Sequence, residues 1–284
     1  MTWTVFFAVL LAALLHATWN SLVKGSPDKY VGMLLIALGH VPPGIIFVFF
    51  APLPGMDVLP WLGASLALHL GYQLFLAASY RVGDLTTVYP IARGSAPLFV
   101  TMVSLTVLDV DLSWGQVGSV GLLILGLLLL SYDRLGTNKR QWTVLILALV
   151  TGGFIASYSI VDGLGARKMG YALAYWGWVA IGNGALMTLW MLLFQPSSMA
   201  KVRLTSQNLT TLLLGGGASY LAYGIVTWAF TQAPIAVITA LRETSVIFAL
   251  LIGLMFLRER STPMKIVACS MTVVGVICLR ITSG

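Results

Sequence analysis

Three ionisable side chains lie deep inside apolar stretches of the sequence, Arg93 in one stretch and the adjacent Arg242 and Glu243 in another. A charge at the centre of a bilayer costs at least about 2.5–3.5 kcal/mol, so such residues are candidates for function in a membrane protein. Arg93 and Glu243 occupy equivalent positions of an internal repeat, and we expect them to form an ion pair that leaves Arg242 available for a substrate carboxylate. The alternatives are a static network of all three side chains, or an Arg242 that reaches toward the membrane surface.

Polar side chains also gather on two other apolar segments. His69, Tyr72 and Gln73 have the spacing i, i+3 and i+4, which places side chains on one face of a helix. A polar face on an apolar helix predicts a lining for water or solute, and a His there can bind or release a proton near neutral pH. The alternative is a neutral His that is hydrogen-bonded between helices. The cavity candidates on these segments are His16, Trp19, Asn20, His69, Tyr72 and Gln73.

Tyrosines near the middle of apolar segments predict aromatic walls for the same cavity. Aromatic rings also gather at membrane interfaces, which better explains the tryptophans at segment ends. Pro90 and Pro97 interrupt the segment that holds Arg93 and predict either a hinge or a fixed kink. The further cavity candidates are Tyr89, Ser95, Tyr158 and Tyr223.

The composition decides what kind of element positions these residues. Of the 284 residues 58% are hydrophobic and only 9% are charged, whereas soluble domains carry about 25% charged residues. This excludes a soluble enzyme, a disordered protein and a secreted disulfide scaffold. The sequence predicts an all-α integral membrane protein with ten transmembrane helices, in the segments 3–23, 31–51, 59–80, 86–107, 113–132, 142–161, 172–194, 209–230, 235–257 and 263–280.

An internal repeat divides these segments into two sets of five. Residues 78–99 resemble residues 228–249 at an offset of 150, so that Ser95 matches Ser245, and Asp109 matches Glu259 beyond them. We expect one repeat over 1–135 and a second over 140–284. Because each has an odd number of spans, the second copy is inverted in the membrane, an architecture common among secondary transporters.

The basic residues predict an orientation. Eleven Lys and Arg residues follow the odd-numbered segments, and only Arg167, Lys168 and Arg280 lie on the opposite side. By the positive-inside rule the first group is cytoplasmic and both termini lie outside. The net charge of +7 comes from single residues at segment ends rather than from a basic run, so we expect membrane lipid and no nucleic acid as a partner.

Ten short-looped spans, a Pro-containing fourth span (residues 89–97, YPIARGSAP) and an acid after the fourth and ninth spans (Asp109, Glu259) resemble the drug/metabolite transporter superfamily, specifically its EamA-type carriers. Within it the chain looks most like the YddG-like exporters of aromatic amino acids. The resemblance implies a central cavity between the repeats, export of amino acids or related metabolites, and a bacterial-type inner membrane. The family usually places the termini in the cytoplasm and a basic loop after span four, whereas here that loop is acidic.

Enzyme motifs are missing from the sequence: it has no H-E-x-x-H, G-x-S-x-G, P-loop or G-x-G-x-x-G, and no Cys/His/Asp/Glu cluster with metal-ligand spacing. We therefore expect neither an enzyme, nor a cofactor, nor a metal, and no use of ATP. A passive facilitator or channel, an exporter of drugs or other metabolites, and a membrane enzyme based on His16 or His69 remain as alternatives. Coupling to a proton is open.

Overall fold

A computed structural model describes residues 1–24, 26–82, 85–132, 139–203, 205–249 and 263–283, and the regular structure in these ranges is all helical. Six helical segments are long and apolar enough to cross a membrane, namely Trp3–Asn20, Lys29–Phe49, Leu59–Val82, Gln141–Met169, Ala172–Phe194 and Ser206–Phe230. The helices Trp114–Leu129 and Ile266–Thr282 are apolar but shorter. The described part of the protein is therefore all helical, with helices suited to cross a membrane.

The first half of the chain contains α1 (Trp3–Lys24), α2 (Lys29–Gly39), α3 (Val41–Phe49), α4 (Leu59–Val82), α5 (Leu85–Thr106) and α6 (Trp114–Tyr132). The second half contains α7 (Lys139–Met169), α8 (Ala172–Phe194), α9 (Pro196–Met199), α10 (Ser206–Thr210), η1 (Thr211–Gly215), α11 (Gly216–Phe230), α12 (Ile235–Arg242) and α14 (Pro263–Thr282). The segment η1 is a π-helical turn that joins α10 to α11 without a break.

The segment expected as one span over 235–257 is not one continuous helix in its described part. The helix α12 ends at Arg242, the next two residues form a turn, and residues 245–249 are helical again, while 250–257 lie outside the described residues. The chain turns because the amides of Glu243 and Thr244 bond to carbonyls only three residues back, at Ala240 and Leu241. The charged pair thus stands at a helix break.

The helix α7 is longer than the expected segment 142–161. Its 31 residues span about 46 Å at 1.5 Å per residue, more than the roughly 30 Å of a bilayer core. Asp162, which the expected boundary placed just outside the span, is therefore inside the helix and fully buried.

Two further helices differ from the expected spans. The expected segment 31–51 is divided at His40 into α2 and α3, with Pro42 and Pro43 in the first turn of α3, where their missing N–H groups leave no helical hydrogen bond unmade. By contrast α5 continues through both Pro90 and Pro97. Pro90 and Pro97 therefore do not interrupt α5. The helix break beside the charged residues follows α12 instead.

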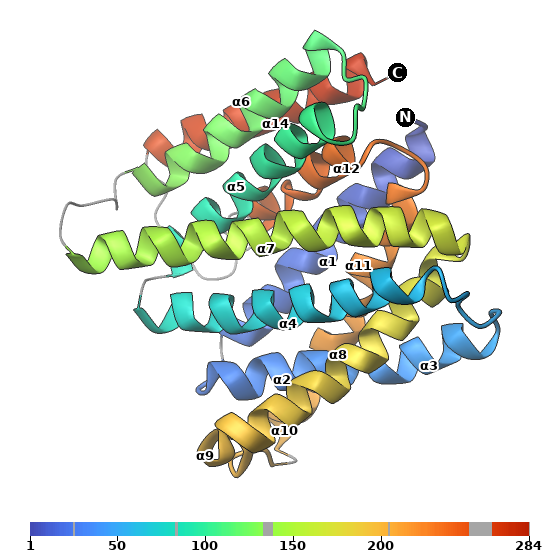
Figure 1. Cartoon of the computed structure of the whole chain (residues 1–284). Helices are drawn as coiled ribbons and strands as arrows, with labels where there is room; N and C mark the ends of the chain where they lie inside the picture. The colour runs from blue at the N-terminus through green and yellow to red at the C-terminus, as the bar shows by residue number, and fades with distance from the viewer. Residues whose placement is uncertain (25, 83–84, 133–138, 204, 250–262, 284) are drawn as a thin grey trace.

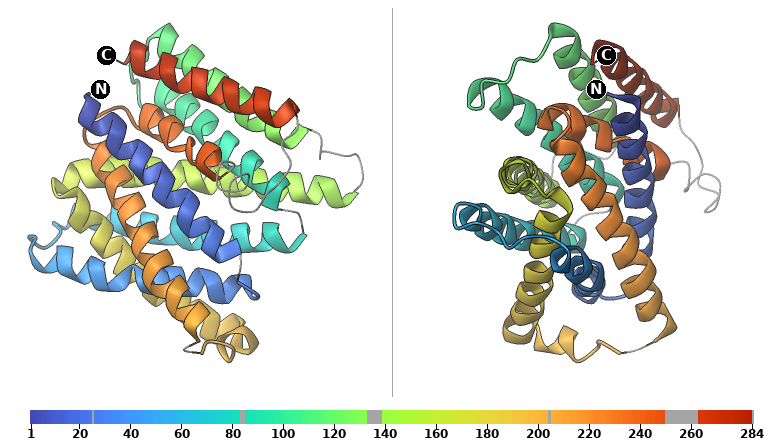
Figure 2. Two further views of the ribbon diagram at one scale, coloured as in Figure 1. Left: turned by 180° about the vertical axis from the view of Figure 1, so that it is seen from behind. Right: turned by 90° about the vertical axis from the view of Figure 1, so that its right-hand side faces the viewer.

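The helices pack as a bundle around α7, which contacts α4 and α5 (Figure 1). The pair α6 and α14 lies side by side along one edge, α8 packs on α3 near the other, and α1 packs on α11 (Figure 2). Both chain ends lie at one end of the bundle, where the Met1 amine donates to the carbonyl of Ser283 (Figure 1). The helices α1, α4 and α8 end at the opposite end of the bundle (Figure 1).

Candidate functional site

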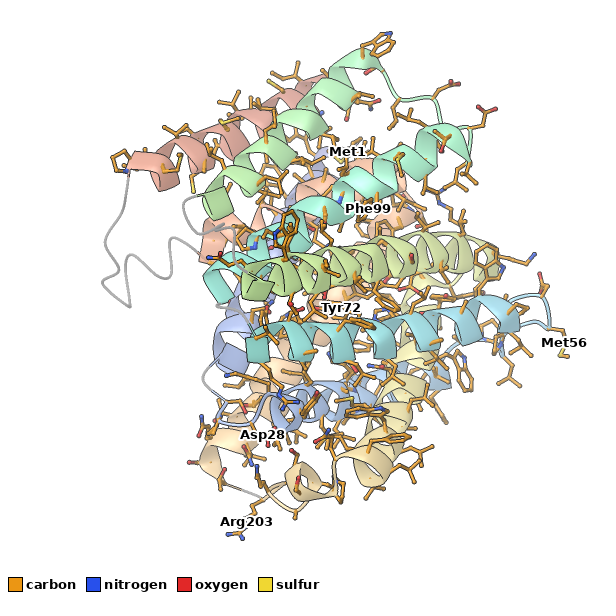
Figure 3. All side chains as sticks on the ribbon, turned by 60° about the vertical axis from the view of Figure 1, so that its left-hand side comes forward. Met1, Asp28, Met56, Tyr72, Phe99 and Arg203 are labelled. Atoms are coloured by element: carbon orange, nitrogen blue, oxygen red, sulfur yellow. The ribbon has the colours of Figure 1, made fainter. Side chains whose placement is uncertain are left out.

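A cavity lies between helices from both halves of the chain. Its volume is about 50 Å³. Because one water molecule needs about 10–15 Å³ of such volume, the cavity has room for a few waters. All three histidines of the chain line it. Figure 3 marks Tyr72, one of the lining residues, in the middle of the bundle. The lining side chains are His16, Trp19, Met33, Ile36, His40, His69, Tyr72, Gln73, Tyr158, Trp176, Asn183, Ser219 and Tyr223.

A buried carboxylate holds one wall of this cavity in place. The Oδ2 atom of Asp162 lies 2.9 Å from Nε2 of His69 and accepts a hydrogen bond of 2.6 Å from the hydroxyl of Tyr223. Its Oδ1 atom accepts a longer bond of 3.3 Å from the hydroxyl of Tyr175. Asp162 is 0% exposed, so these three groups from α4, α11 and α8 replace the water that a carboxylate would otherwise need.

Aromatic rings form the rest of that wall. The imidazole of His69 stacks on the ring of Tyr158 with centroids 4.3 Å apart, and Tyr223 meets Trp176 edge-on at 4.7 Å. Tyr72 packs edge-on against Tyr158 at 5.5 Å. Such contacts contribute about 0.5–1.5 kcal/mol each beyond the area they bury, and the exposed ring faces can stack on an apolar or aromatic solute.

The expected ion pair between Arg93 and Glu243 is present. Nε of Arg93 lies 2.6 Å from Oε2 of Glu243, and Nη2 of Arg93 donates to Oγ of Ser245 at 3.3 Å. Nε of Arg242 lies 3.6 Å from the other carboxylate oxygen of Glu243. Glu243 therefore lies between two arginines. The sequence suggested that Arg242 stays without a partner, whereas it lies beside Glu243.

The rings of Tyr158 and Tyr223 adjoin this charged cluster. The guanidinium carbon of Arg242 lies 6.0 Å from the centroid of Tyr158 and 5.9 Å from that of Tyr223, at the outer limit of cation–π contact. Both rings line the cavity, whereas the charged side chains are not among its lining residues. The cluster of Arg93, Arg242 and Glu243 thus lies beside the cavity wall rather than on it.

The structure brings many of the cavity candidates together. Seven of them line the cavity, namely His16, Trp19, His69, Tyr72, Gln73, Tyr158 and Tyr223. Asn20 and Ser95 are not among the described lining side chains. Asn20 donates to the carbonyl of His16 in its own helix, and Ser95 packs against α7, where its Oγ would lie 2.0 Å from a Cβ added to Gly152. The side chain of Tyr89, like Glu259, lies outside the described residues.

Asp162 is the main residue that the sequence reasoning missed, because the expected span ended at residue 161. The signal was available, since Gly163, Leu164, Gly165 and Ala166 continue the apolar stretch beyond the aspartate. Asp162 also follows Tyr158 by four residues, so the two share a helix face. Of the other cavity residues, His40 and Asn183 gave no signal, because each is a single polar residue in an apolar helix.

No group of three or more His, Cys, Asp or Glu side chains that could hold a metal ion occurs among the described residues. No protein-family model and no curated protein matches the sequence. A solved structure described only as "Crystal structure of protein" is similar to this chain with a TM-score of 0.76, over 99% of this chain and 96% of that one. The two sequences are 16% identical, so the likeness shows a shared fold.

Proposed function

We propose that this chain is a secondary transporter of the EamA type, which moves amino acids, with aromatic ones favoured, or related small metabolites by alternating access. The observation that carries the proposal is the cavity at the centre of the bundle. It is walled by aromatic rings, and a buried cluster of Arg93, Arg242 and Glu243 lies beside it at a helix break. Discontinuous helices with charges near a central site are typical of secondary transporters.

Ten spans in two inverted repeats, over 1–135 and 140–284, belong to the same proposal. The packing supports it, because helix contacts occur in pairs that the repeat relates. The contact of α1 with α11 corresponds to that of α7 with α4, and the contact of α5 with α7 corresponds to that of α12 with α1. The pairs α5–α12, α6–α14 and α3–α8 each join equivalent helices of the two halves.

The distribution of charge supports the proposed orientation in a bacterial-type inner membrane. Lys29, Arg81, Lys201 and Arg203 lie where α2 begins and where α4 and α8 end, at the end of the bundle opposite the termini (Figure 1). The positive-inside rule makes this end cytoplasmic. The variants Lys29→Cys and Arg203→Cys test this orientation by their reaction with a membrane-impermeant thiol reagent. We expect labelling only after the membrane is opened.

The small size of the cavity bears on the mechanism. Pockets that enclose drug-sized ligands are about 300–1,000 Å³, so a cavity with room for a few waters must widen before an aromatic amino acid enters. Such widening is what a carrier needs, whereas a passive facilitator or channel needs a continuous open path. We therefore place the carrier first and the facilitator second.

Radiolabelled counterflow in proteoliposomes tests the proposal. Saturable exchange of labelled phenylalanine or tryptophan against the unlabelled amino acid, at equal pH on both sides, is expected for a carrier. Flux without saturation or exchange would favour a facilitator. No exchange across a broad amino acid panel, from protein shown to be folded, would remove the amino acid assignment and leave drugs and other metabolites to be tested.

A further inference from the structure

Two groups of buried charge contact the rings of Tyr158 and Tyr223. Arg242, with Arg93 and Glu243 behind it, contacts both rings at about 6 Å. The imidazole of His69, which is bonded to Asp162, contacts the same rings at 4.3 and 5.3 Å. The first group carries a formal charge of +1, and the second carries −1 as long as His69 is neutral.

These two charges compensate one another in a place where water cannot. An uncompensated charge inside a membrane protein is strongly unfavourable, and charges separated by low-dielectric rings attract over longer distances than in water. One proton added to the imidazole makes the His69–Asp162 pair neutral as a whole. The arginine cluster is then left with an excess of one positive charge, which a carboxylate in the cavity would balance.

We propose that the His69–Asp162 pair is a proton-binding site that is coupled to the binding of a carboxylate-bearing solute in the adjoining cavity. The inference rests on the proposed transport function and gives it a coupling ion and a chemical class of substrate. By thermodynamic linkage the proton and the carboxylate each raise the affinity for the other by the same factor.

The hydrogen bonds around Asp162 give the proton a second effect. The Oδ2 atom serves both His69 and Tyr223, while Oδ1 serves Tyr175, and an ionised carboxylate can accept all three bonds. An imidazolium at His69 donates a charge-assisted hydrogen bond to the same Oδ2 atom and competes with the Tyr223 hydroxyl for it. Because Tyr223 lines the cavity and its ring lies 5.9 Å from the guanidinium of Arg242, its release would open a path from the cavity to that guanidinium.

Other titratable and charged groups around the pair come from every helix that packs on it. His40, at the junction of α2 and α3, lines the same cavity as His69, and the uncharged ring of Trp176 from α8 lies 5.5 Å from that of His69. Arg167, further along α7, already donates to the carbonyls of Phe230 and Ala233. The titratable and charged groups that face the pair, apart from Arg167, are Tyr158, Tyr175, Tyr223, His40, His16 and Arg242. None of these groups is a carboxylic acid, so Asp162 is the one carboxylate of this wall among the described residues.

The repeat also predicts how many protons take part. At the offset of 150 residues the position equivalent to His69 is Ser219, which lines the cavity but binds no additional proton near neutral pH. The second half of the chain therefore has no imidazole to match, and one proton accompanies each carboxylate.

Binding to the purified full-length protein in lipid nanodiscs tests the coupling. The probes are 3-phenylpropionate, which has a carboxylate and no ammonium, and 2-phenylethylamine, which has the reverse. The affinity for phenylpropionate should rise about tenfold between about pH 8 and about pH 5.5, and that for phenylethylamine should not rise. Asp162→Asn, which is neutral and isosteric, should bind phenylpropionate tightly and equally at both pH values. Asp57→Asn, a matched change of an exposed aspartate that pairs with Lys168, should follow the unmodified protein.

The inference is overturned if Asp162→Asn keeps the pH dependence, or if phenylethylamine gains affinity in acid as phenylpropionate does. A second measurement needs no ligand. With only three histidines, labelled imidazole signals can be assigned by single His→Gln variants and followed by NMR. The His69 signal should change its protonation state between about pH 8 and about pH 5.5 and lose that change in Asp162→Asn. A His69 that holds one state over this range refutes the proposal, even if no probe binds.

Failure of this inference can be told apart from failure of the transport proposal. Counterflow at equal pH needs no proton coupling, so its absence counts against the carrier alone. The histidine titration needs no transport, so its absence counts against the proton site alone. If Asp162→Asn does not fold, His69→Gln removes the imidazole, and the same loss of pH dependence is expected.

Discussion

The guanidinium of Arg93 lies 2.6 Å from the carboxylate of Glu243, and the two side chains are only 2% and 0% exposed. They come from α5 and from the break after α12, so a buried charge pair joins two halves of the bundle that are far apart in sequence. Removing one partner of such a pair leaves the other charged and without solvent, which costs about 3–5 kcal/mol.

Glu243→Gln should lower the free energy of unfolding by about 3–5 kcal/mol and abolish counterflow, because it leaves two buried arginines without a counter-charge. Arg93→Met should also abolish counterflow but destabilise less, because Arg242 still lies 3.6 Å from Glu243. The double variant removes one positive and one negative charge together, and its loss of stability should be smaller than the sum of the two single losses. Thermal unfolding in detergent and counterflow in proteoliposomes measure the two effects. Additive losses, or full transport in both single variants, would show that the pair has neither role.

Tyr72→Leu should raise KM for tryptophan by about 2–10-fold and change the maximal rate little, because one ring face of the cavity wall is lost. Phe75→Leu is the matched control. Phe75 is an aromatic residue on the same helix that stacks on Phe154 at 5.2 Å and is not among the cavity residues, so KM should stay unchanged. Equal effects of the two changes on KM would count against an aromatic binding wall.

The contact between α2 and α11 depends on two glycines that face each other. A Cβ added to Gly216 would lie 2.5 Å from Cα of Gly39, so Gly216→Ala should destabilise the protein by about 1–3 kcal/mol through forced separation of the helices. At the adjacent Gly217 an added Cβ meets nothing within 4 Å. Gly217→Ala should therefore be neutral or stabilise by roughly 0.5–1 kcal/mol, since alanine is the better helix former. Thermal unfolding decides, and similar Tm changes at both positions would contradict this packing.

Asp28 should make stability depend on pH at the start of α2. Burial raises the pKa of its carboxyl, but hydrogen bonds from Ser198, Lys201 and the amide of Val31, with the charge of Lys201, outweigh that effect and hold the pKa below its ordinary value. A group whose pKa is lowered by folding contributes stability that is complete above its unfolded pKa, about 3.9, and disappears as the pH falls through the folded value.

Asp28→Asn should accordingly lower Tm by about 1–3 °C near neutral pH, and the difference should vanish as the pH falls below about 4. Unfolding curves of both proteins across this range provide the measurement. The exposed pair of Asp57 and Lys168 is a control, and Asp57→Asn should change Tm less. A Tm difference at Asp28 that does not depend on pH would mean that the helix cap, and not the charge, is responsible.

Membrane character and the positions of most helices follow from hydropathy alone, because the energetic cost of exposing polar groups to lipid fixes where apolar stretches begin and end. The pairing of Arg93 with Glu243 also follows, since buried charges need partners of opposite sign. Seven of the candidates line the cavity, and they were singled out as polar or aromatic side chains on apolar segments.

What the sequence did not reveal depends on contacts between segments. The break after Arg242 removes helical hydrogen bonds that hydropathy does not register, and it occurs where buried charges and polar side chains stabilise the turn. Asp162 looked like the end of a span because an acid is expected at an interface. Its burial is possible only because His69, Tyr175 and Tyr223 come from three other helices to bind it.

The π-helical turn at Thr211–Gly215 amounts to a one-residue insertion within the helix that continues into α11. Such an insertion shifts the helix phase, so that the residues before it point about 100° away from where an unbroken α-helix would place them. Deleting one residue there would re-aim α10 and its loop and change how η1 meets α1 and α2, but leave Ser219 and Tyr223 in the cavity wall. The same deletion in α4, between Leu59 and His69, would rotate His69 away from Asp162 or shift the register of the whole helix. Length variation in this fold should therefore be tolerated in the π turn and excluded from α4.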